Sequence, residues 1–413
     1  MKLNISYLRF PFLFYIRMSL RQLFLQQIAQ TSPEPIGLEI VKAKGIYQYA
    51  ADGKKYLDMI SGFSVANIGH SHPKVVEAVQ KQAAEYMHLI VYGEFIEAPQ
   101  VMYASLLTQH LPANLNCVYF TNSGAEATEG AMKLSKRATG RSKIIAFNKS
   151  YHGSTQGALS IMGSEYWRNT YRPLLPDVYH FDYNSDEAIE AIDENTACVI
   201  VETIQAESGI HKPNAAWLHQ LRERCTEKNA LLVLDEIQCG FGRTGTLWAF
   251  EQYNIVPDIL LLGKALGGGM PLGAFIANRN LMQLLTHNPV LGHITTFGGH
   301  PVSCAAGKAA MEVLLEENLM AAVPQKEQLV LSLIHHKNII EKRSAGLWAS
   351  LTFSSHEGNK KVVHKCLEKG LITDWFLFAP EALRIAPPLI ITEDAIKEMC
   401  LLLNEAIEEA TGV

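Results

Sequence analysis

The chain has 413 residues, of which 48% are apolar and 19% charged, and its formal net charge is −5. This composition is typical of a globular protein, and the even mixture of acidic and basic residues argues against a basic face that binds nucleic acid. No apolar run approaches the roughly 20 residues that span a bilayer, and the seven cysteines include no C-x-x-C pair. We therefore expect a cytoplasmic protein without a membrane anchor, disulfide frame or metal site, whose partners are small molecules.

The chain begins with a leader and a hairpin. Residues 1–17 are apolar but interrupted by Arg9 and Pro11, and we interpret them as a leader of uncertain order. Residues 18–60 start with a helical segment and continue as GIYQYAADGKKYLDMISG, in which alternating Tyr residues flank an Asp-Gly turn. This pattern predicts a β-hairpin. We expect this N-terminal segment to join a small domain formed by the end of the chain.

Residues 61–300 have the pattern of a large α/β domain. A helix is expected over KVVEAVQKQAAEYM, where apolar residues recur at fourfold spacing. Beyond it, amphipathic segments alternate with the apolar runs CVYFT, KIIAF, ACVIVE, LLVLDE and DILLLGK. Strands that are apolar on both faces and separated by helices indicate a mainly parallel central sheet flanked by helices. Such sheets bind their ligands at the carboxyl ends of the strands.

Residues 301–413 predict a smaller α+β domain. A long helix over SCAAGKAAMEVLLEE is followed by short strands within GLWASLTF, LITDWFLF and LRIAPPLII, and a terminal helix begins at Glu393. The strict alternation of strand and helix ends at about residue 300, which favours a separate domain over residues 301–413.

Two ionisable residues close neighbouring strands of the large domain. Asp235 ends LLVLD and Lys264 ends DILLLGK, so both side chains should emerge at the same edge of the sheet. A lone lysine after a strand is most often a solvated surface residue. The chemistry of this pair therefore depends on its neighbours.

Two further segments end at the same edge. TNSGAEATEG passes from a strand into a helix, which places Ser123, free backbone N–H groups and the helix dipole where a phosphate can bind. Tyr151, after KIIAF, offers an aromatic plane for a flat cofactor. Each feature alone also fits a plain helix cap or core packing. Together with Lys264 and Asp235, they match the needs of pyridoxal phosphate: an amine for its aldehyde, a carboxylate for its ring nitrogen, a phosphate cup and a stacking plane.

The chain resembles the class III aminotransferases, a fold type I group that includes ornithine, acetylornithine and 4-aminobutyrate aminotransferases. The matching segments include YLDMISGFSVANIGHSHP, TNSGAEATEGAMKL, VETIQAESG, LLVLDEIQCGFGRTGTLWAFE and TTFGGHPVSCAAG. The resemblance implies that Lys264 holds pyridoxal 5′-phosphate as a Schiff base and shuttles a proton, and that Asp235 pairs with the ring nitrogen. The remaining cofactor-binding residues that it implies are Ser123, Gly124, Ala125, Tyr151, His152, Glu202, Gln238 and Thr296. Thr296 matches a residue that the neighbouring subunit contributes, so a homodimer with shared active sites is expected.

Arg384 and Glu207 match a pair that selects substrates in this family. The resemblance implies that Arg384 binds a carboxylate of a keto acid such as 2-oxoglutarate, and that Glu207 covers this arginine while an ω-amine donor reacts. A purely structural ion pair is the alternative. The implied reaction is a ping-pong transamination.

One position departs from the family pattern. Ornithine, acetylornithine and 4-aminobutyrate enzymes usually carry Arg directly after an aromatic-x-Gly triplet, but Ser154 follows Tyr151-His152-Gly153 here. The expected second clamp for a carboxylate is therefore missing, unless Arg168 or Arg172 replaces it.

Two alternatives remain open at this stage. Gly153-Ser154-Thr155-Gln156-Gly157 resembles a degenerate nucleophile elbow, which would indicate a serine- or threonine-type α/β hydrolase. A pyridoxal-phosphate aminomutase or decarboxylase would use the same lysine and aspartate.

Overall fold

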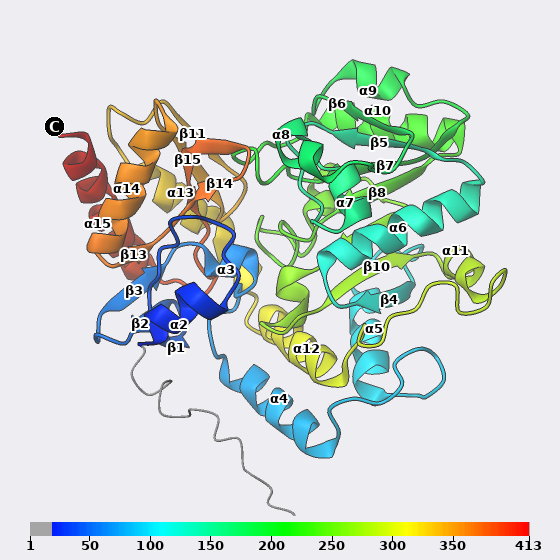
Figure 1. The fold of residues 1–413 in the computed structure, drawn as a ribbon, viewed down its shortest axis with the longest axis horizontal. Helices are drawn as coiled ribbons and strands as arrows, with labels where there is room; N and C mark the ends of the chain where they lie inside the picture. Colours follow the sequence, from blue (N-terminus) through cyan, green and yellow to red (C-terminus); the bar gives the residue numbers. More distant parts are fainter. Residues whose placement is uncertain (1–18, 413) are drawn as a thin grey trace, which may run out of the picture.

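The computed structural model describes residues 19–412, so the expected leader at residues 1–17 lies outside them. The N-terminal segment and the C-terminal strands and helices lie together on one side, and the middle of the chain forms a larger unit on the other (Figure 1). Helix α12 (Pro301–Glu316) packs on α4 (Pro73–Glu85) and α5 (Ala98–Gln109) of the larger unit. The division into a large domain over 61–300 and a small one over 301–413, joined by 18–60, stays our proposal.

A seven-stranded sheet forms the centre of the larger unit. Its order is β4-β10-β9-β8-β7-β5-β6, and the pairs among β9, β8, β7, β5 and β6 are parallel, which confirms the expected sheet. Strand β10 pairs antiparallel with both β4 and β9. The strands are β4 (Cys117–Thr121), β5 (Lys143–Phe147), β6 (Val178–Phe181), β7 (Thr196–Glu202), β8 (Leu231–Asp235), β9 (Ile259–Leu262) and β10 (Gly273–Ala277). Sequence patterns did not predict β6 or β10.

Helices cover both faces of this sheet. In β7, Cys198 and Ile200 face the cluster that contains α6 (Gly124–Thr139), whereas Val199 and Val201 face the cluster that contains α10 (Ala215–Lys228). Successive residues of a strand point to opposite faces of the sheet. Because helices cover both faces, all four side chains are buried. Burying an aliphatic side chain contributes about 1.5–3 kcal/mol, so the continuous apolar runs fix these strands in the interior.

The N-terminal hairpin joins the smaller unit. Strands β2 (Tyr47–Ala50) and β3 (Lys55–Asp58) pair antiparallel, as predicted, and β1 (Ile40–Lys44) extends them. Strand β3 also pairs in parallel with β13 (Leu371–Ile372) near the end of the chain.

The rest of the smaller unit is an antiparallel sheet with helices. Its order is β11-β12-β15-β14. The strands are β11 (Glu341–Ser344), β12 (Ala349–Thr352), β14 (Trp375–Phe376) and β15 (Ala379–Ile385), and the helices are α13 (Val323–Leu333), α14 (His356–Glu368) and α15 (Glu393–Thr411).

Short helices complete the described chain. They are α2 (Leu20–Gln27), α3 (Ser61–Ser64), α7 (Gln156–Ser160), α8 (Glu165–Arg168), α9 (Asp186–Glu190) and α11 (Arg279–Met282), with 3-10 turns η1 (Asn169–Tyr171), η2 (Ala249–Tyr253), η3 (Lys264–Gly267), η4 (Gln283–Thr286) and η5 (Leu319–Ala322). Within residues 19–412, no helix combines the length and apolarity needed to cross a membrane.

Candidate active site

The ends of three adjacent strands bring charged side chains together. Glu202 is the last residue of β7 and Asp235 the last of β8, and the two are register partners. Strand β9 pairs with β8 and ends at Leu262, so Lys264 follows at the same edge. The φ of Lys264 is 48°, a conformation that costs a residue with a side chain on the order of 1 kcal/mol and is concentrated at functional sites.

A cavity of about 240 Å³ opens at this edge, and ten of the expected site residues line it. They are Ser123, Gly124, Ala125, Tyr151, His152, Glu202, Glu207, Asp235, Gln238 and Lys264. Arg384 reaches the cavity through its contact with Glu207. Thr296 does not line the cavity, and its side chain is exposed.

Asp235 is held by two hydrogen bonds. Its Oδ2 accepts from His152 Nδ1 at 2.7 Å, and its Oδ1 accepts from the backbone N–H of Ile237 at 2.9 Å. Burial disfavours the charged imidazole, but the hydrogen bond and charge of Asp235 outweigh it and raise the pKa of His152. The carboxylate therefore faces the cavity in a fixed orientation, and His152 touches both this carboxylate and the cavity wall.

The N-terminus of α6 forms an anion cradle. Ser123 caps the helix, with its hydroxyl accepting from the N–H of Glu126 at 3.2 Å, and the first N–H groups of a helix have no acceptor within it. A Cβ on Gly124 would lie 2.7 Å from Ile237 Cδ1. A Cβ on Gly153, whose φ is 130°, would lie 2.5 Å from that of Ala125. Glycine at these two positions lets the chain pack closely around the start of α6, whose free N–H groups fit a phosphate group.

Gly153→Ala is expected to weaken cofactor binding about 10- to 100-fold, because the added methyl would push Ala125 and strain the backbone by about 1–3 kcal/mol. Fluorescence titration of the cofactor-free protein with pyridoxal phosphate measures this change. Gly140→Ala is the control: its φ is 69° and nothing lies within 4 Å of its Cβ position. Equal affinity in the two variants would contradict the assignment of the cradle.

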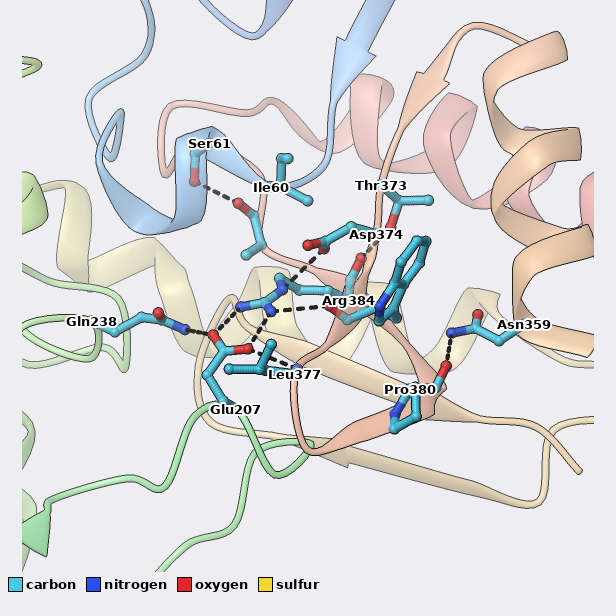
Figure 2. A network of polar contacts seen from close by, with 12 residues as sticks. Ile60, Ser61, Glu207, Gln238, Asn359, Thr373, Asp374, Leu377, Pro380 and Arg384 are labelled. Carbon is cyan, nitrogen blue, oxygen red and sulfur yellow. Dashed lines mark hydrogen bonds and ion pairs between the residues drawn. The ribbon is translucent and has the colours of Figure 1, made fainter. Parts of the chain in front are cut away.

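Arg384 lies at the centre of a second network (Figure 2). Its Nη1 and Nη2 donate to the two oxygens of Glu207 at 3.0 and 2.8 Å, and its Nε donates to Asp374 at 3.0 Å. The guanidinium also lies 5.1 Å from the ring centre of Phe63 and 4.3 Å from that of Phe376. Sequence reasoning missed Asp374 and both rings. An acidic residue two positions after the short apolar strand β13 was the available signal for Asp374.

Burial and charge act in opposite directions on this network. Burial raises the pKa of Glu207, but the Arg384 guanidinium outweighs it and holds that pKa at about 2. Burial dominates at Asp374 and raises its pKa to about 6. Glu207 is thus the principal counter-ion of the arginine, which agrees with its two-point hydrogen bonding.

Gln238 connects the arginine network to Lys264. Its Nε2 donates to Glu207 at 3.3 Å (Figure 2), and its Oε1 accepts from the Lys264 amine. Burial lowers the pKa of Lys264, although the charge of Glu207 opposes this effect. A lowered pKa increases the share of neutral amine, which is the form that attacks a carbonyl.

Comparison with known proteins assigns this site to a family. A family model described as aminotransferase class-III matches residues 28–407. The chain belongs to the class-III aminotransferases. These enzymes depend on pyridoxal phosphate, and the cradle, the carboxylate and the lysine of this aminotransferase fit that cofactor.

The aminotransferase is similar to characterised proteins over nearly its whole length. It is 38% identical to an acetylornithine aminotransferase of Methanopyrus kandleri, covering 89% of this chain and 94% of the relative, and 36% identical to one of Bacillus subtilis, covering 91% and 96%. The ornithine aminotransferase structure of Toxoplasma gondii, described with pyridoxal phosphate at its active site, superimposes with a TM-score of 0.87 at 29% identity, covering 94% and 93%.

The alternatives from the sequence find no support. The family match is to an aminotransferase, and neither a hydrolase, an aminomutase nor a decarboxylase is among the relatives cited. Ser154 is exposed, and its hydroxyl contacts the Tyr151 hydroxyl at 3.1 Å. The neighbouring His152 is instead engaged with Asp235.

Glu207 is expected to make the aminotransferase sensitive to acid. Because its pKa falls from 4.5 in the unfolded chain to about 2 in the fold, its contribution is present above pH 4.5 and is lost as the pH falls towards 2. The full contribution is about 3 kcal/mol. Denaturant titrations of the wild type and Glu207→Gln at several pH values measure it: the difference in unfolding free energy should shrink over this range. A difference that does not depend on pH would contradict it.

Proposed function

We propose that the aminotransferase moves a terminal amino group from an ω-amine donor to a 2-oxo acid such as 2-oxoglutarate, in two half-reactions at one site. The observation that carries this proposal is the Arg384 guanidinium, paired with Glu207 and joined through Gln238 to Lys264. The ornithine and acetylornithine aminotransferases to which the chain is similar support this class of reaction.

Each side chain at the sheet edge has a proposed task. Bound pyridoxal phosphate supplies an electron sink for the carbon that carries the amino group. The Lys264 amine would hold the cofactor, and the same amine would carry the proton to and from the substrate carbon. Asp235 would keep the ring nitrogen protonated and Tyr151 would cover the ring. Gln238 would bind near the ring oxygen, Glu202 would orient the ring, and the Ser123-Gly124-Ala125 turn would bind the phosphate.

The Glu207–Arg384 pair is proposed to separate the two half-reactions. With the pair closed, the arginine is neutralised and an amine without a carboxylate at that end can enter. With Glu207 turned away, the planar guanidinium can bind a keto-acid carboxylate through two parallel hydrogen bonds. One cavity can then serve both substrates in turn.

We infer a homodimer in which Thr296 completes the phosphate site of the partner. The exposed side chains around Thr296 support this inference, because Ile294 is 56% and Phe297 52% exposed in the single chain. Exposed apolar side chains of this size gather at protein interfaces. A cytoplasmic location is also proposed, supported by the unpaired state of the seven cysteines.

The visible absorption of the purified protein, supplied with pyridoxal phosphate, tests the proposal. A band from the lysine-bound cofactor should appear, an ω-amine should bleach it, and 2-oxoglutarate should restore it. A protein that forms no band, or whose band responds to no amine, would show that the proposed function is wrong.

A further inference from the structure

Ser154 stands in a part of the active-site cavity that has no free positive charge. Among the described residues that line the cavity, Lys264 is the single lysine or arginine, and our proposal assigns it to the cofactor. His152 also lines the cavity, but it is paired with Asp235. Three carboxylates line the same space: Glu202, Glu207 and Asp235. The wall around the reacting amine is therefore acidic or neutral.

Arg384 is also not free to pair with a carboxylate of the donor. Its side chain is buried, and Glu207 and Asp374 together take up its Nε, Nη1 and Nη2 donors. The rings of Phe63 and Phe376 flank the guanidinium and offer no hydrogen bond of their own. A carboxylate can reach this cation only by displacing Glu207.

The two arginines that follow in the chain are also engaged elsewhere. Arg168 donates to Glu165 and lies 2.7 Å from a ring nitrogen of His180, and Arg172 donates to Glu165 at 2.8 Å. Neither side chain lines the cavity. They therefore do not replace the arginine that the family pattern places after the aromatic-x-Gly triplet.

Two neutral hydroxyl side chains, those of Ser154 and Tyr151, line the cavity at this wall. The Ser154 and Tyr151 hydroxyls lie 3.1 Å apart and bond to each other. Such a pair can exchange hydrogen bonds with an amide, a hydroxyl or an ammonium group. A carboxylate placed here would find no free lysine or arginine of the described chain to pair with, and an unpaired charge is unfavourable in a partly dry cavity.

We propose that the amino donor is an aliphatic diamine or its mono-acyl derivative, and that Ser154 selects against donors which carry an α-carboxylate. This inference rests on the proposed function. The proposed donor differs from acetylornithine, for which the relatives are named, although the cofactor site is of the same kind. The remote end of the preferred donor is neutral or cationic, and it contacts the Ser154 and Tyr151 hydroxyls.

Matched donors that differ by one carboxylate test this proposal. The pairs are ornithine and putrescine, N-acetylornithine and N-acetylputrescine, and lysine and cadaverine. Stopped-flow bleaching of the cofactor band isolates the donor half-reaction, so no acceptor is needed. The donor without the carboxylate should react about 10- to 100-fold faster at low concentration, the range expected for one unpaired charge. Ser154→Arg should reverse this preference, and Ser154→Ala should keep it.

A binding measurement provides a second readout. Valerate has a carboxylate but no amine, and isothermal titration should show at least about tenfold tighter binding to Ser154→Arg than to Ser154→Ala. If the carboxylated donors react as fast as their partners in the wild type, the donor assignment is overturned while the aminotransferase function stands. If no amine of the panel bleaches the band, the proposed function fails, and the donor assignment fails with it.

Discussion

Replacing Lys264 with alanine is expected to abolish the visible band of the lysine-bound cofactor and to lower the transamination rate at least about 10⁴-fold. The variant loses both the amine that holds the cofactor and the base that moves the proton, and the neighbouring Gln238 offers only an amide. The cradle at α6 remains intact, so pyridoxal phosphate should still bind reversibly. Absorption spectra and single-turnover kinetics with an ω-amine measure these losses.

Lys81→Ala serves as the matched control for this variant, because Lys81 is exposed on α4, away from the cavity lining. It should keep the band and the rate. Added methylamine or ethylamine is expected to restore part of the Lys264→Ala activity, since a free amine can enter the space left by the side chain. A Lys264→Ala protein with the wild-type spectrum would rule out this lysine as the attachment point.

Arg384→Met is expected to lower the free energy of unfolding by about 3–5 kcal/mol, because it leaves Glu207 and Asp374 in the interior without their cation. The same variant should bind 2-oxoglutarate about 10- to 100-fold more weakly, since the two-point hydrogen bonding to its carboxylate is lost. Denaturant titration measures the first effect, and the acceptor half-reaction measures the second.

Two comparisons show whether the loss of stability in Arg384→Met comes from the buried ion pairs or from the removal of an arginine as such. Arg224→Met removes an exposed pair with Glu227 and should change stability by less than about 1 kcal/mol. The double variant Arg384→Met/Glu207→Gln should be more stable than Arg384→Met alone, because one unpaired carboxylate is removed. If Arg384→Met were as stable as Arg224→Met, the buried network would contribute little to the fold.

Local pattern was sufficient for most strands that are buried on both faces, although β10 is equally buried and was not predicted. The runs that form β5, β7, β8 and β9 are continuous and apolar, and each could be placed from the sequence. Strand β11 could not, because its residues Glu341, Lys342, Arg343 and Ser344 include no apolar side chain and its pairing with β12 is tertiary. Strand β6 is a short edge strand whose side chains are mostly half-buried, so its signal was equally weak.

The sequence by itself determined the sheet, the family and the placement of Asp235 and Lys264, because these depend on strand periodicity and on short motifs whose residues are neighbours in the chain. The resemblance predicted that Glu207 pairs with Arg384, but only the tertiary structure showed that Asp374 and the rings of Phe63 and Phe376 also contact this arginine. Glu207 lies in the segment after β7, Asp374 lies between β13 and β14, and both contact Arg384 on β15. The tertiary structure also showed that Arg168 and Arg172 bind Glu165, so that Lys264 is the single lysine or arginine among the described residues that line the cavity. Contacts of this kind depend on where distant segments meet, and no periodicity in the chain records that.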